Sequence, residues 1–110
     1  MKTNWATWCG PCIAELPNVK ATYEKFHDSG FEIIGISLDQ DRDALTGFVK
    51  QQGLAWPQYF DGKGWSNKLA ARNGIQSIPA TFLLDREGRI VAMNRRGSAL
   101  AEAVAQQLAP

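Results

Sequence analysis

The segment Trp8-Cys9-Gly10-Pro11-Cys12 constrains the fold most, because it holds both cysteines of the chain and leads directly into an apolar helical pattern. A sulfur at the first turn of a helix faces unpaired backbone N–H groups and the positive end of the helix dipole, which favour thiolate over thiol. Such cysteines have pKa values of roughly 3.5–7.5, against about 8.5 for a free cysteine. Pro11 suits the first helical turn, where its missing N–H would have no partner. We therefore expect a dithiol that can close to a disulfide and reopen.

Three other interpretations of the two cysteines are weaker. A structural zinc site needs about four nitrogen or sulfur ligands, and the chain adds only one histidine, His27, to its two cysteines. A purely structural disulfide across so short a loop constrains the unfolded chain far less than one that closes a loop of about 15 residues. Two inert buried cysteines would not require this order of five residues. Redox chemistry is the favoured interpretation.

The segment from Trp5 to Cys12 resembles the active-site segment of the thioredoxin superfamily. The following Ala14-Glu15-Leu16-Pro17 is similar to the extracytoplasmic TlpA/ResA-type branch, and the likeness continues through residues 30–39, 56–62 and 74–88. The resemblance implies one thioredoxin-like domain over residues 1–110. Its fold class would be α/β, with a central mixed sheet flanked by helices on both faces.

Composition excludes several classes of partner. Twelve basic and 11 acidic residues leave a net charge of +1, which gives no electrostatic basis for binding nucleic acid or an anionic membrane. No run approaches the roughly 18 apolar residues of a membrane span, so no direct membrane insertion is expected. The first four residues lack the apolar region of a signal peptide. The resemblance nevertheless implies the bacterial periplasm or the extracytoplasmic side of the membrane, with the export or anchor segment outside this sequence.

Hydrophobic periodicity predicts the order β-α-β-α-β-β-α. The strands are expected at 1–6, 31–38, 80–84 and 89–93, and the helices at 11–28, 41–52 and 99–108, the last capped by Ser98. Between them, 54–64 is a loop-rich insert that is briefly extended at 56–60, and 66–73 forms a short helix. Right-handed crossovers make the first two strands parallel, and the last two form an antiparallel hairpin. The first strand is short and polar where relatives have a longer apolar one, which indicates either a truncated fragment or a divergent start.

The resemblance assigns roles to the two sulfurs. Cys9 would be the attacking sulfur and the more exposed of the two, and Cys12 would resolve the mixed disulfide that Cys9 forms with a substrate. Gly10-Pro11 resembles the dipeptide of reducing thioredoxins, which favours reduction over oxidation of substrates.

Other candidate site residues follow from the same resemblance. Glu15 is expected to accept protons from the thiols, because the TlpA/ResA branch has an acid there and Thr3 occupies the place where thioredoxin has a buried acid. The alternative is a solvated carboxylate that favours an early helical turn. The Ile78-Pro79 bond is expected to be cis, presenting the Ile78 backbone for strand-like pairing with an extended substrate. Trp8 is expected either to contact substrate or to lie at the edge of the core. We expect Trp56 and Trp65 to serve packing, and Arg95-Arg96 to be a solvated pair.

The leading functional hypothesis is a thiol–disulfide oxidoreductase that reduces or exchanges protein disulfides, in envelope thiol maintenance or cytochrome c maturation. An upstream reductant protein would reset the dithiol, and neither a cofactor nor a metal is expected. A hydroperoxide-reducing redoxin is disfavoured, since Lys2 and Ala6 replace the proline and threonine that precede peroxidatic cysteines. The third hypothesis is a non-catalytic binding module of a longer protein.

Overall fold

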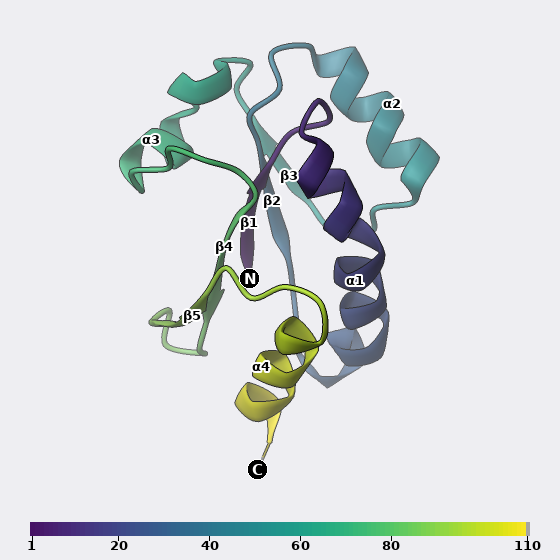
Figure 1. The fold of residues 1–110 in the computed structure, drawn as a ribbon, viewed down its shortest axis with the longest axis vertical. Coiled ribbons are helices and arrows are strands. Elements are labelled where there is room, and N and C mark those ends of the chain that lie inside the picture. The colour runs from purple at the N-terminus through teal and green to yellow at the C-terminus, as the bar shows by residue number, and fades with distance from the viewer. Residues whose placement is uncertain (110) are drawn as a thin grey trace.

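The computed structural model describes residues 1–109, which form a single sheet with helices on both faces (Figure 1). The strands are β1 (Lys2–Trp5), β2 (Ile34–Ser37), β3 (Gln58–Phe60), β4 (Ala80–Leu84) and β5 (Ile90–Met93). The α-helices are α1 (Gly10–Phe26), α2 (Arg42–Gln52), α3 (Lys68–Arg72) and α4 (Ser98–Leu108), and 3₁₀ turns cover His27–Ser29 and Gly64–Ser66.

The strand order β3-β2-β1-β4-β5 places β1 at the centre of the sheet. β1 runs parallel to β2 and antiparallel to β4, and β4 and β5 form an antiparallel hairpin, as predicted. The polar Asn4 of this strand is fully buried, and its Nδ2 donates to the carbonyl of Ala80 (3.0 Å), although its Oδ1 has no hydrogen-bond partner among the described residues. The expected first strand is therefore short but fully integrated.

The insert contributes more than was predicted. The extended stretch at 58–60 is a fifth strand, β3, which pairs in parallel with β2 and forms one edge of the sheet. Three residues are too few to show an alternating pattern, so the sequence alone did not separate this strand from a loop.

The helices divide unequally between the two faces of the sheet. The crossovers β1-α1-β2 and β2-α2-β3 step in the same direction along the sheet, so right-handed connections place α1 and α2 on one face. α4 packs beside α1, while the short α3 lies on the opposite side of the strands (Figure 1). The α/β thioredoxin-like architecture is confirmed, with its main core between the sheet and α1, α2 and α4.

The helix ends explain how the loops around the site are held. Asp41 caps α2 and Asn67 caps α3 through side-chain oxygens. The prediction that Ser98 caps α4 is wrong: Ser98 is the first helical residue, and Gly97 occupies the cap position without a side-chain bond.

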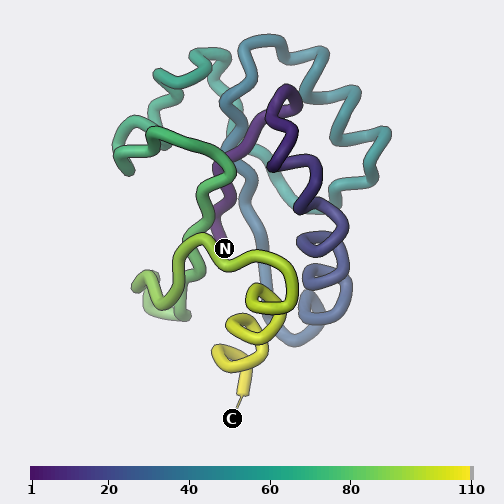
Figure 2. Tube along the Cα trace, viewed as in Figure 1, coloured from purple at the N-terminus to yellow at the C-terminus, as the bar shows by residue number. Residues whose placement is uncertain are grey.

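Figure 2 shows the turn between β1 and α1 in the upper half of the molecule, away from the C-terminal end of α4 at the bottom.

Candidate active site around the Cys9–Cys12 disulfide

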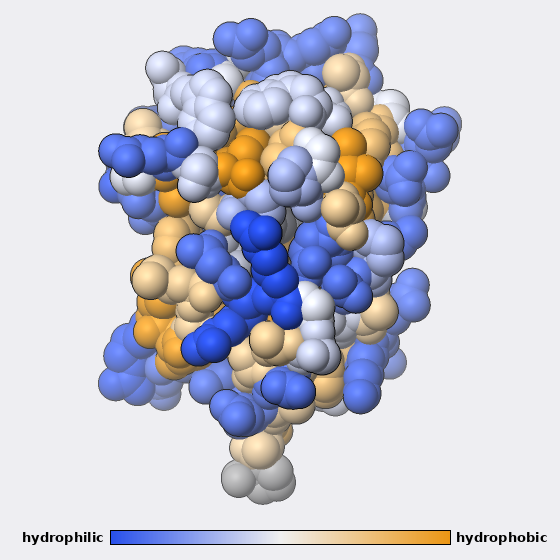
Figure 3. All heavy atoms as spheres, in the orientation of Figure 1, coloured by the Kyte–Doolittle hydropathy of each residue, from blue (hydrophilic) through white to orange (hydrophobic). Residues whose placement is uncertain are grey.

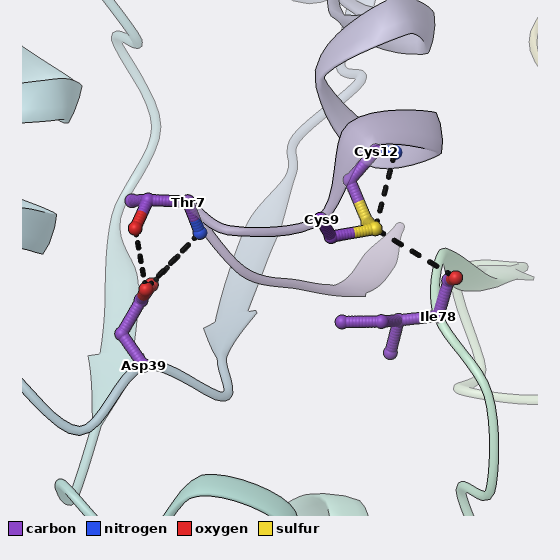
Figure 4. The surroundings of a disulfide bond; sticks show 5 residues. All are labelled: Thr7, Cys9, Cys12, Asp39 and Ile78. Atoms are coloured by element: carbon purple, nitrogen blue, oxygen red, sulfur yellow. Dashed lines mark hydrogen bonds between the residues drawn. A yellow bond between two sulfur atoms is a disulfide. The ribbon is translucent and has the colours of Figure 1, made fainter.

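Cys9 and Cys12 form a disulfide at the start of α1, with their Cα atoms 5.2 Å apart (Figure 4). Cys9 is the N-cap residue, in an extended conformation, and its sulfur accepts a hydrogen bond from the backbone N–H of Cys12 (3.2 Å). This N–H is one of the donors that the first turn of a helix leaves without a backbone partner. The Cys9 sulfur therefore lies where a negative charge would be stabilised, as the sequence predicted.

The two cysteines are equally buried in the oxidised protein, with exposed fractions of 5% for Cys9 and 4% for Cys12. The expectation that Cys9 is clearly the more exposed residue is therefore wrong for this state. Cys9 is buried because the segment at 78–79 covers its sulfur on the side opposite α1.

The Ile78–Pro79 peptide bond is cis, as predicted. The carbonyl oxygen of Ile78 lies 3.7 Å from the Cys9 sulfur (Figure 4). A disulfide sulfur carries no proton, so this is a polar contact in the oxidised state; a reduced Cys9 thiol could donate to the same oxygen. The contact brings the segment before β4 against the reactive pair, although the two are 69 residues apart in sequence.

The turn that carries Trp8 and Cys9 is held by a buried carboxylate that sequence reasoning missed. Asp39, 2% exposed, accepts hydrogen bonds from the backbone N–H of Thr7 (3.1 and 3.2 Å) and from its hydroxyl (2.6 Å). The Ser37 hydroxyl adds a third donor (2.7 Å). Figure 4 shows Asp39 pointing at Thr7 from beyond the end of β2. The available signal was an acidic residue directly after a buried parallel strand, at the edge of the sheet where ligands bind.

Glu15 and Cys12 line one small cavity beneath the disulfide, together with Thr3 and Pro79. The cavity measures about 30 Å³, enough for a water molecule. Glu15 Oε1 accepts a hydrogen bond from the backbone N–H of Gly97 (2.7 Å), so the carboxylate also ties α1 to the loop before α4. Cys12 and its predicted proton acceptor, Glu15, therefore line the same cavity, but the Glu15 carboxylate does not contact the Cys12 sulfur directly.

Two exposed tryptophans flank the site. Trp8 is 55% exposed and Trp65 48%, with ring centroids 6.1 Å apart. The 3₁₀ turn at 64–66 leaves about half of Trp65 in solvent and lays its ring against Trp8, so the prediction that Trp65 serves packing stays a prediction. The same prediction is confirmed for Trp56, which is buried and lies against the ring of Tyr23.

Other chemistry finds little support in residues 1–109. No group of three or more histidine, cysteine, aspartate or glutamate side chains is arranged to hold a metal ion in this described part of the chain. His27 lies in the turn after α1, where its ring stacks on Tyr23 and its Nδ1 lies 3.1 Å from the carbonyl of Phe31. Among the described helices, none is both long and apolar enough to cross a bilayer.

A Cys-x-x-Cys disulfide that caps the helix after a central strand, opposite a cis-proline, defines the thioredoxin-like class. The Redoxin family model matches residues 3–107, and the chain belongs to that family, as a TlpA/ResA-type member of the thioredoxin superfamily.

Relatives agree with this assignment. The chain is 38% identical to the thiol-disulfide oxidoreductase ResA of Bacillus thuringiensis (strain Al Hakam) over 87 residues, which cover 79% of this chain and 49% of that protein. It is 30% identical to ResA of Bacillus subtilis (strain 168), with 79% and 47% covered. The chain thus spans about half the length of the curated relatives it matches.

Solved structures match over nearly the whole chain. A thiol-disulfide oxidoreductase from Bacteroides fragilis superposes with a TM-score of 0.87 at 31% identity, covering 96% of this chain and 77% of that one. The thioredoxin domain of a thiol-disulfide oxidoreductase from Bacteroides vulgatus gives 0.89 at 29% identity, covering 98% and 77%.

Proposed function

We propose that this protein is a thiol–disulfide oxidoreductase that reduces or exchanges disulfides in other proteins through Cys9 and Cys12. The observation that carries the proposal is the hydrogen bond from the Cys12 N–H to the Cys9 sulfur at the start of α1. A donor at that position stabilises the thiolate, which is the reactive form of cysteine. The family membership and the relatives named above support the same activity.

The reaction proceeds in two exchanges. The Cys9 thiolate attacks one sulfur of a substrate disulfide, forming a Cys9–substrate disulfide and releasing the other substrate sulfur as a thiolate. The Cys12 thiolate then attacks Cys9, forms the Cys9–Cys12 disulfide and releases the second substrate thiolate. Two electrons pass from the protein to the substrate, and the two released thiolates take up protons. A separate reductant protein then returns both electrons to Cys9–Cys12.

Glu15 is the proposed acceptor of the Cys12 proton. It lines the same cavity as Cys12, and the cavity has room for a water molecule to carry the proton between them. Thr3, at the position of the buried acid of thioredoxin, lines the cavity too but cannot accept a proton near neutrality.

Trp8, Ile78 and Pro79 are the proposed substrate contacts. Trp8 offers an exposed apolar face beside the disulfide, and the Ile78 backbone lies against the Cys9 sulfur. An extended substrate segment that pairs with this backbone would bring its own sulfur to Cys9. The contacts of these residues with the site support the roles that the family resemblance implies.

The substrates are proposed to be protein disulfides on the extracytoplasmic side of a bacterial membrane, including those of cytochrome c maturation. The Gly10-Pro11 dipeptide favours the reducing direction. A potential measured against glutathione tests that direction, because about 30 mV corresponds to 1.4 kcal/mol for a two-electron couple.

The activity is tested by the reduction of insulin with dithiothreitol. The wild-type protein is expected to accelerate precipitation of the insulin B chain, and Cys9→Ser to leave only the uncatalysed rate. Cys12→Ser is expected to accumulate a mixed disulfide with substrate, detectable as a mass increase. Equal rates for wild type and Cys9→Ser would contradict the proposal. Consumption of hydrogen peroxide, followed in the same preparations, tests the disfavoured peroxidase.

The role of Glu15 has its own test. Glu15→Gln keeps a side-chain oxygen that can accept from the Gly97 N–H but cannot take a proton. We expect the attack of Cys12 on the mixed disulfide to slow by at least about tenfold near pH 7, and to recover above about pH 9, beyond the ordinary pKa of a cysteine thiol. An unchanged pH profile would remove Glu15 from the mechanism.

A further inference from the structure

The loop between β5 and α4 places two arginines on the cavity that Cys12 also lines. Arg95 and Arg96 are exposed, yet both line the cavity that Cys12, Glu15 and Pro79 also line, so they lie at its rim. Figure 3 shows the most hydrophilic side chains of this face gathered across its middle, over the region of this loop. The sequence placed these arginines only as a solvated pair.

Both ends of the Arg95–Arg96 dipeptide are fixed. On one side, Asn94 bonds to β4 twice: its N–H donates to the carbonyl of Thr81 (2.9 Å), and its Oδ1 accepts from the Thr81 N–H (3.0 Å). On the other side, the Gly97 N–H donates to Glu15 (2.7 Å). Asn94 has a φ of 55°, in the left-handed region, which turns the chain sharply out of β5. The guanidinium groups therefore extend from a held segment rather than from a free loop.

Within residues 1–109, neither arginine has an anionic partner. In the described residues, the ion pairs within 4.0 Å join His27 to Glu32 and Arg89 to Asp85 and Glu87, and none includes Arg95 or Arg96. The charged groups that line the cavity are these two cations and one anion, Glu15. One further carboxylate would bring the net charge of the groups that line the cavity to zero.

We propose that Arg95 and Arg96 form a subsite for a carboxylate side chain of the disulfide substrate, close in sequence to the cysteine that Cys9 attacks. This rests on the proposed function. A substrate segment paired with Ile78 would pass next to Pro79, which lines the cavity that has the arginines at its rim. A planar guanidinium can bind a carboxylate through two parallel hydrogen bonds, which suits an anion of fixed orientation. The protein would thus prefer disulfides flanked by aspartate or glutamate over those flanked by neutral or basic residues.

The test uses short peptides whose single cysteine is linked to 2-thiopyridine. Both peptide ends are blocked, and the only charge is a Glu, Gln or Lys placed one or two residues before or after the cysteine. Attack by the reduced protein on the cysteine sulfur forms the protein–peptide disulfide and releases 2-thiopyridone, whose absorbance gives the second-order rate constant in a stopped-flow experiment.

In at least one position the Glu peptide is expected to react about two- to fivefold faster than its Gln counterpart, which is the size of effect that an exposed ion pair gives. The Lys peptide is expected to react most slowly. Raising the ionic strength from about 0.02 M to about 0.5 M should bring the ratio close to one. In the Arg95→Gln/Arg96→Gln protein the ratio should be close to one at low salt as well. Arg96→Gln alone should lower the Glu-to-Gln rate ratio more than Arg95→Gln alone does, because Arg95 also lines a depression shared with Glu102.

The matched control is Arg72→Gln/Arg86→Gln, which removes the same charge from α3 and from the β4–β5 turn. It should keep the wild-type ratio. Equal rates for all peptides with the wild-type protein would overturn the subsite and leave the oxidoreductase intact. A preference lost equally in the control would overturn it in favour of a general field effect. A wild-type protein that attacks none of the peptides and does not reduce insulin would overturn both proposals.

Discussion

Removal of the Asp39 carboxylate is expected to loosen the turn that carries the dithiol. The carboxylate is almost fully buried and accepts from three donors: the Thr7 N–H, the Thr7 hydroxyl and the Ser37 hydroxyl. Hydrogen bonds to charged groups contribute about 1.5–3 kcal/mol each, but the burial of a carboxylate opposes them. The two hydroxyls can rotate toward other partners in the variants, whereas the Thr7 N–H cannot. We therefore expect Asp39→Ala to lower the free energy of unfolding by about 3–5 kcal/mol, and Asp39→Asn, which keeps one acceptor, by about 1–2 kcal/mol.

Urea denaturation of the oxidised protein measures both changes, as shifts in midpoint at constant slope. A double-mutant cycle of Asp39→Asn with Thr7→Val isolates the contact between the two side chains, for which we expect a coupling of about 1–2 kcal/mol. Asp41→Asn serves as the control, because Asp41 is an exposed helix cap close in sequence, where asparagine caps equally well. Losses below about 0.5 kcal/mol for both Asp39 variants would refute the claim that this network holds the turn.

Four further substitutions test other parts of the fold. Asn67→Ala removes the cap of α3 and leaves the buried carbonyl of Ser37 without its donor, so thermal or urea unfolding should show a loss of about 2–4 kcal/mol. Trp56→Ala should lower the free energy of unfolding by about 3–5 kcal/mol, because Trp56 is buried. Trp65→Ala should lower it by no more than about 1 kcal/mol, because Trp65 is exposed. Equal losses would contradict the assignment of Trp65 to the surface. The backbone N–H and the side chain of Arg89 hold the pKa of Asp85 below its ordinary value of 3.8, so its contribution to stability is complete above that pH and is lost as the pH falls through the folded-state pKa. Asp85→Asn should therefore flatten the acid side of the stability profile below about pH 4, and a profile unchanged from wild type would contradict this.

The architecture around β1 and α1 was predictable because its signals are local. Cys9, Pro11 and the apolar spacing after them specify a helix that begins at the dithiol, and the structure places that helix after a central strand. The cis bond before Pro79 was predictable only through the family resemblance, since X–Pro bonds in general are cis in about 5–6% of cases.

The features that escaped prediction depend on contacts distant in sequence. Asp39 meets Thr7 across 32 positions, and Glu15 meets Gly97 across 82, so neither local spacing nor helix periodicity reveals them. Glu15 bonds the Gly97 N–H at the start of α4, where a side-chain cap from Ser98 had been expected. The exposure of Trp65 likewise depends on a 3₁₀ turn whose direction is set by tertiary structure.

The hydrogen bond from the Cys12 amide to the Cys9 sulfur has a consequence for the speed of electron transfer. The amide belongs to the rigid first turn of α1 and already points at the sulfur while the bond between the cysteines is closed. When that bond opens, the charge that appears on sulfur meets a dipole that is in place, so little of the surrounding protein or solvent has to reorganise.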